Sequence, residues 1–117
     1  MIKPEDLFDV GDTLYLGGDP DEPHRRSAIS RYYYGCHLLA ARVTNTEGDR
    51  GEGSHGAVID SLRRRGKTKL ATDMDDLRKH RNLCDYKIHK PFEHQVARRL
   101  KKKAKKTKEL LQALKDD

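Results

Sequence analysis

The strongest constraint on the fold is a helical spacing that runs through residues 70–88. The positions that share one face are Leu70, Met74, Leu77, Arg81, Cys84 and Ile88. They step by four, three, four, three and four residues, which is one side of an α-helix. Every member is apolar except Arg81. A guanidinium on a core-facing stripe costs free energy unless something pairs with it. We therefore expect either a buried acidic partner for Arg81 or a cleft that an anion can enter.

The composition favours one small helical domain. The chain has 117 residues, of which 34% are hydrophobic and 38% are charged. A β-sandwich or barrel would need more β-branched and aromatic residues, whereas a slim bundle with solvated outer faces fits. We predict a single all-α domain over residues 1–117, an up-and-down bundle of four to five helices.

The sequence also favours a cytoplasmic protein. No apolar run is long enough for a transmembrane helix, and the first residues lack the apolar segment of a signal peptide. Cys36 and Cys84 both fall on apolar helical faces. We expect them to be buried, reduced thiols rather than a disulfide.

Periodicity, caps and turn residues give approximate helix positions. The expected helices cover residues 5–16, 24–43, 54–66, 69–84 and 91–114, and a polar, glycine-rich loop is expected over 44–53. The last helix is expected to begin at Pro91, because proline is favoured in the first turn of a helix. Its predicted inward positions are Phe92, Val96, Leu100, Ala104, Thr107, Leu111 and Leu114.

Charge is distributed unevenly along the chain. The net charge is +6, but residues 1–23 contain seven acidic residues and one basic residue, which leaves +12 for the remainder. An acidic N-terminal arm with a short helix, attached to a basic body, suggests affinity for polyanions. Residues 98–108 contain eight bases and no acid. We predict that Arg98, Lys102 and Lys105 contact an RNA backbone; the alternative is a solvated outer helix face.

A second group of candidate residues lies in the segment 31–37, which combines basic and aromatic side chains. Tyr34 is three residues from both Arg31 and His37, so each of them forms a neighbouring pair with Tyr34 on the helix surface. Such a group could stack on or clamp a nucleotide. The alternative is core packing, with the tyrosine hydroxyls hydrogen-bonded across helices.

Arg81, Asn82 and His89 are the sharpest candidates for catalysis. An arginine can hold a phosphate through two hydrogen bonds and stabilise the charge that develops in cleavage. A histidine can move the proton of a ribose hydroxyl near neutral pH. We predict that Arg81 holds a scissile phosphate, Asn82 orients it, and His89 or His37 moves protons.

Two conditions decide between this interpretation and a structural one. The helix must end near residues 85–86 for Arg81 and His89 to converge, and Arg81 must not be held in an intrahelical pair with Asp85. His80, Cys84 and His89 form only a weak zinc pattern. We expect neither a metal nor another cofactor.

Three stretches of the sequence together resemble the small HEPN-domain proteins. Residues 26–37, RSAISRYYYGCH, are similar to the family signature R-S-A-x-S-R-x-Y-Y-A-x-F-H. Residues 55–59 and 77–86, HGAVI and LRKHRNLCDY, are similar to the family's H-G-x-V and L-x-x-x-R-x-x-A-D-Y pieces. The resemblance implies an up-and-down helical bundle that forms a homodimer, binds RNA and has a nucleotidyltransferase-type antitoxin as a partner. Many members are metal-independent endoribonucleases of toxin–antitoxin or defence systems.

The catalytic members have four to six residues between the arginine and the histidine of their motif. In this chain seven residues separate Arg81 from His89, and Asp85 and Tyr86 stand where the histidine would come. Two functions therefore stay open: an endoribonuclease, or a non-catalytic module that binds a nucleotidyltransferase or a nucleotide. The second would show Arg81 held by Asp85 with no open cleft. In either case Arg31, Tyr34, Asp85 and Tyr86 are expected at the binding site. A plain helical assembly protein is the third interpretation.

Overall fold

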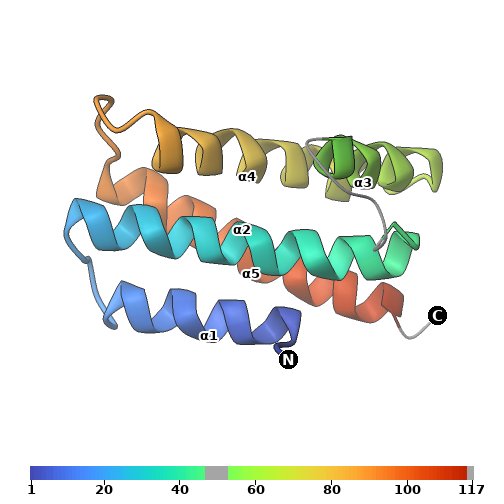
Figure 1. Ribbon diagram of the computed structural model, residues 1–117, viewed down its shortest axis with the longest axis horizontal. Coiled ribbons are helices and arrows are strands. Elements are labelled where there is room, and N and C mark those ends of the chain that lie inside the picture. The colour runs from blue at the N-terminus through green and yellow to red at the C-terminus, as the bar shows by residue number, and fades with distance from the viewer. Residues whose placement is uncertain (47–52, 116–117) are drawn as a thin grey trace.

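The chain folds as an all-α bundle, which confirms the predicted fold class. The computed structural model describes residues 1–46 and 53–115, and these form five α-helices and no strand. In chain order the helices are α1 (Pro4–Tyr15), α2 (Glu22–Thr44), α3 (Gly53–Arg64), α4 (Thr68–Tyr86) and α5 (His94–Lys115). Figure 1 shows α2 between α1 and α4, with α5 behind α2 and α3 near the start of α4. Most of the predicted loop 44–53 lies outside the described residues.

The long helix α2 organises the bundle. It packs against each of the other four helices, whereas α1 packs against α2 alone among the helices described. Three consecutive tyrosines of α2, residues 32–34, carry much of this role because neighbouring helical positions point about 100° apart. Their hydroxyls hydrogen-bond in turn to Asp12 of α1, His55 of α3 and Arg81 of α4. The prediction of hydroxyls bonded across helices is confirmed.

Two glycines let α1 lie close to α2. A Cβ atom at Gly11 would lie 2.5 Å from the Tyr32 ring, and one at Gly35 would lie 2.5 Å from the Phe8 ring. Phe8 and Tyr32 are fully enclosed as a result. Glycine weakens an isolated helix, but here the close packing requires it. The acidic segment 1–23 is therefore a layer of the bundle rather than a separate arm.

The stripe that begins at Leu70 is buried as far as Cys84 and then ends. The prediction for Ile88 is wrong: its side chain is 78% exposed, because α4 stops at Tyr86. The predicted start of the last helix at Pro91 is also wrong, since α5 begins at His94. Phe92, expected inside that helix, is buried from the connection before it.

Both cysteines are buried and free, as predicted. Burial raises the pKa of Cys84 to about 12, so its thiol stays protonated at neutral pH. Cys36 donates a weak hydrogen bond to the carbonyl of Ala104 at 3.4 Å. Neither thiol is therefore a nucleophile in the native fold.

Among the described residues no helix is both long and apolar enough to span a membrane.

Candidate nucleic-acid interface

The guanidinium of Arg81 is held between α4 and α2 by four side chains, the most distant being the hydroxyl of Tyr86 at 3.4 Å. Its Nε lies 2.9 Å from Oδ2 of Asp85, one turn further along α4. One Nη donates to Oδ1 of Asn82 at 2.9 Å, and the other donates to the hydroxyl of Tyr34 on α2. The Arg81–Asp85 pair predicted as the structural alternative is present, although the Nε–H does not align on an acceptor as a full hydrogen bond.

Two tyrosine rings flank the same guanidinium. Its Cζ lies 4.8 Å from the ring centre of Tyr34 and 5.3 Å from that of Tyr86, distances at which a cation attracts an aromatic face. Arg31 lies over Tyr34 as well, at 5.7 Å. Tyr86 is 69% exposed, so much of its ring is available to another planar group.

Two stacked histidines adjoin the tyrosines. The rings of His37 and His55 lie 4.2 Å apart, and Tyr33 bonds to Nδ1 of His55 at 2.5 Å. His37 is 8% exposed and its Nδ1 has no hydrogen-bond partner. Burial, reinforced by the charges of His55 and nearby arginines, lowers the pKa of His37 to about 4. Burial and the same arginines also lower the pKa of His55, and both imidazoles are neutral at pH 7.

Positive charge exceeds negative charge around these rings. We call the group the arginine–tyrosine cluster; it comprises Arg31, Tyr34, His37, His55, Arg78, Arg81, Asp85 and Tyr86. Arg31 and Arg78 are half-buried and form no ion pair with any described residue. Within this cluster of described residues Asp85 is the only carboxylate, against three guanidinium groups, and it pairs with Arg81. A partly buried excess of positive charge attracts anions.

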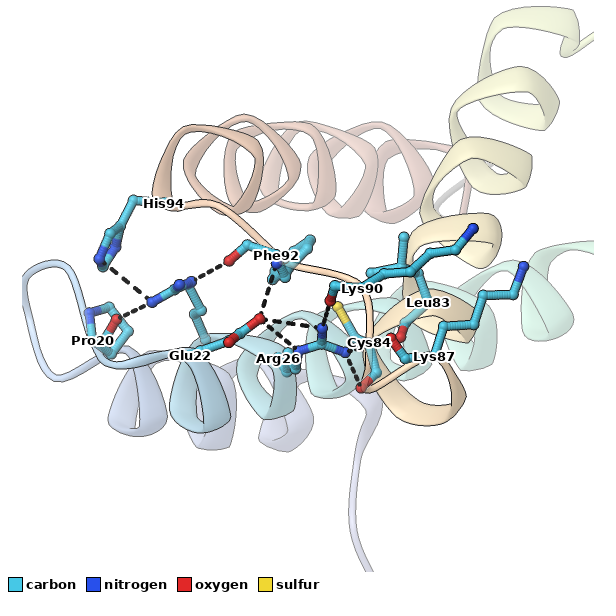
Figure 2. Close-up of polar contacts among 10 residues, drawn as sticks. Pro20, Glu22, Arg26, Leu83, Cys84, Lys87, Lys90, Phe92 and His94 are labelled. Atoms are coloured by element: carbon cyan, nitrogen blue, oxygen red, sulfur yellow. Dashed lines mark hydrogen bonds and ion pairs between the residues drawn. The ribbon is translucent and has the colours of Figure 1, made fainter.

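A second buried arginine sets the end of α4. Arg26 of α2 is 7% exposed and donates to four backbone carbonyls (Figure 2). The acceptors are those of Leu83 at 3.0 Å, Cys84 at 3.2 Å, Lys87 at 3.4 Å and Lys90. The last carbonyls of a helix have no partner within it, and a cation there also complements the helix dipole. Arg26 therefore caps α4 and fixes where Asp85 and Tyr86 lie.

Glu22 completes this cap. It accepts hydrogen bonds from Nε of Arg26 at 3.3 Å and from the backbone N–H of Phe92 at 2.9 Å (Figure 2). One turn after Arg26 on α2, Ser30 donates a hydrogen bond to Oδ2 of Asp85 at 3.1 Å. Two of the HEPN-like stretches, about fifty residues apart, thus meet at the end of α4.

His89 shares no hydrogen bond, ion pair or ring contact with the cluster among the described residues. The helix ends at Tyr86, as convergence with Arg81 requires, but His89 lies exposed in the connection 87–93. Its side chain makes no hydrogen bond or ion pair within the described residues. His37 is the predicted proton-transfer residue that the structure does bring into the cluster, through Tyr34 at 6.5 Å between ring centres.

The basic run of α5 lies elsewhere. Arg98 pairs with Asp19 at 3.1 Å and Lys105 with Asp12 at 2.8 Å, while Lys102 is exposed. These three predicted RNA contacts share no hydrogen bond or ion pair with the arginine–tyrosine cluster. Within the same run, Arg99 and Lys103 both pair with Asp76 of α4. Acids of the N-terminal segment and of α4 therefore offset much of the charge of this helix.

Sequence reasoning missed three contributors to the site: His55, Arg78 and the capping role of Arg26. His55 and Arg26 lie in the stretches that resemble HEPN proteins, and that resemblance could have identified them. No motif or spacing in the sequence indicated a role for Arg78. In the part of the chain that the structure describes, no three metal-binding side chains come together. His80, considered as a zinc ligand, instead bonds to Asp76.

No protein-family model matches this sequence, and no curated protein or solved structure matches it either. The site is therefore interpreted from its own geometry.

Proposed function

We propose that this chain is a HEPN-like module that binds RNA at the arginine–tyrosine cluster and does not cleave it. The observation that carries the proposal is the excess of guanidinium groups around Tyr34. Arg31 and Arg78 have no carboxylate partner among the described residues and can each take a phosphate. The exposed ring of Tyr86 supplies a surface on which an unpaired base can stack.

The state of Arg81 favours binding over cleavage. Asp85, Asn82 and Tyr34 already engage its guanidinium. A scissile phosphate would have to displace Asp85, and among the described residues neither His37 nor His55 bonds to Arg81 or Asp85. This arrangement fits the non-catalytic alternative, in which Arg81 is held by Asp85.

The resemblance to HEPN proteins extends the proposal to the assembly. The meeting of two of the HEPN-like stretches through Ser30 and Asp85, and through Tyr34 and Arg81, supports that resemblance. On this basis the chain would act as a cytoplasmic homodimer with a nucleotidyltransferase-type partner, within a toxin–antitoxin or defence system.

A metal-independent endoribonuclease is the second candidate. It is favoured by the neutral imidazole of His37. Both His37 and Arg81 lie against the ring of Tyr34. In this version Arg81 would hold the scissile phosphate after release from Asp85, and His37 would accept the proton of the attacking ribose hydroxyl.

One experiment distinguishes the candidates. Labelled single-stranded RNA is incubated with the full chain in chelator, and binding is followed by anisotropy and integrity by gel. We expect bound, intact RNA, with weaker binding by Arg31→Ala and Arg78→Ala and unchanged binding by Lys79→Ala, an exposed lysine on another side of α4. Cleavage that survives chelator and disappears in Arg81→Ala would support the nuclease. Absence of binding at low salt would contradict both and favour a plain assembly protein.

A further inference from the structure

A groove separates α5 from the turn between α1 and α2. Its volume is about 670 Å³, within the range typical of small-molecule sites. The helices α1 and α5 do not pack directly against each other. Lysine side chains bridge them instead: the ammonium groups of Lys101 and Lys108 lie 4.2 Å and 4.9 Å from the rings of Tyr15 and Phe8.

Tyr15 lines this groove with a hydroxyl that lacks a partner. The side chain is 3% exposed, and its oxygen makes no hydrogen bond with any described residue. Asp19 and Arg98, the charges that act most strongly on this hydroxyl, line the same groove. A buried hydroxyl without a partner is costly and uncommon, which points to a ligand atom that reaches it when the Lys101 side chain, now 4.2 Å from the Tyr15 ring centre, moves aside.

The rim of the groove is basic and its walls are mainly apolar. Lys101 and Lys102 line it and form no ion pair with a described carboxylate, and Lys106 reaches Glu109 only at 3.9 Å. The walls are the Tyr15 ring, over which the Lys101 ammonium group lies, and the aliphatic stems of the exposed Lys102 and Lys106. Such stems cover apolar surface while their charged ends reach water.

From these features we infer a binding site for a small amphipathic anion. Its apolar body lies between the Tyr15 ring and the lysine stems, and its anionic head lies at Lys101 and Lys102. An oxygen of the head accepts a hydrogen bond from the Tyr15 hydroxyl. A polyanion fits less well, because Asp12 and Asp19 already occupy Lys105 and Arg98 at this rim. The site shares no residue with the arginine–tyrosine cluster, so it does not depend on the proposed RNA binding.

The ligand chemistry is tested by calorimetric titration of the full chain with octanoate. We expect saturable binding of octanoate. Acetate carries the head without the apolar body, and 1-octanol carries the body without the charge, so both should bind at least tenfold more weakly. Equal binding of acetate or of 1-octanol would overturn the inference, as would displacement of octanoate by single-stranded RNA.

Two variants test the position of the ligand. Tyr15→Phe keeps the ring and removes the hydroxyl, and should weaken octanoate binding about tenfold, the usual value of a hydrogen bond to a charged group. Gly18→Trp places a ring in the groove, where a Cβ meets no atom within 4 Å, and should abolish binding. Lys79→Ala is the control and should bind normally. Unchanged binding by either groove variant, with its melting temperature retained, would contradict the site. RNA binding should be unchanged in both, which keeps this result separate from that proposal.

Discussion

Two arginines on facing helices, Arg26 buried and Arg81 half-buried, differ in what holds them. Arg26 of α2 is 7% exposed and is bound mainly by backbone carbonyls at the end of α4 (Figure 2). The side chain of Arg81 on α4 is 12% exposed and is bound by Asp85, Asn82 and Tyr34. Backbone carbonyls at a helix end cannot leave without unfolding, whereas side chains can rotate away. Arg26 therefore belongs to the scaffold, whereas Arg81 positions Tyr34 and Asp85 of the proposed RNA site through side-chain contacts that can rearrange.

The largest expected effect comes from Arg26→Met. The substitution removes the donor that joins four carbonyls and the Glu22 carboxylate, and should lower the free energy of unfolding by about 3–5 kcal/mol. Leu83, Lys87 and Glu22 each keep one backbone N–H donor. Urea denaturation followed by circular dichroism measures the loss. A loss below about 1 kcal/mol, the range of an exposed ion pair, would remove the distinction between the two arginines.

Acid should weaken the Arg81 region, because that region holds neutral histidines. The folded chain lowers the pKa of His37 from 6.5 to about 4, so the unfolded chain binds the proton more readily between these values. The resulting stability is complete above pH 6.5 and is lost as the pH falls toward 4, by up to about 3 kcal/mol. Urea midpoints at pH 7 and pH 4.5 test this.

Two histidine variants serve as matched controls for the acid effect. His37→Asn should flatten the pH dependence, because it removes the buried imidazole. His89→Gln removes an exposed imidazole without contacts and should keep the wild-type curve. An identical flattening in both variants would show that His37 is not the group responsible.

Arg81→Met should lower the free energy of unfolding less than Arg26→Met does, and it should weaken RNA binding more. Asp85 keeps its hydrogen bond from Ser30 and stays partly hydrated, so we expect a loss of about 1–2 kcal/mol, between exposed and buried pairs. RNA affinity should fall at least tenfold, measured by anisotropy at constant salt. A destabilisation equal to that of Arg26→Met would place both arginines in the scaffold.

Ser30→Ala should have the smallest effect. It removes one hydrogen bond between the two regions, that from Ser30 to Asp85, and should lower the free energy of unfolding by about 1 kcal/mol. A double-mutant cycle with Arg81→Met measures how far the two sites are coupled. Strict additivity would mean that Asp85 holds Arg81 without help from Ser30.

Much of the fold could be predicted from local spacing, and its errors have a specific cause. The three-and-four pattern located the buried face of α4 through Cys84, because helical periodicity depends only on neighbouring residues. It failed at Ile88 because Arg26, about sixty residues earlier in the chain, ends the helix. A stop imposed by a distant side chain leaves no mark in the apolar spacing, although the expected helix over residues 69–84 ends within two residues of the observed end at Tyr86.

For the site, too, contacts within one helix could be predicted from the sequence, and contacts between helices could not. Asp85 was identified as a partner of Arg81 from its position one turn away. The contacts of Tyr34 with Arg81, and the place of His55, depend on how α2, α3 and α4 pack, which spacing does not determine. Counting the charges of each segment could not predict that Asp12 and Asp19 form ion pairs with Lys105 and Arg98 of α5.

The tyrosine run at residues 32–34 makes the chain sensitive to length as well as to composition. Each hydroxyl reaches a different helix, so a deleted or inserted residue just before the run would turn all three by about 100°. No single replacement elsewhere in α2 could restore three separate partners. Related chains that keep this packing should therefore vary in loop length and in surface residues, while α2 admits neither insertions nor deletions.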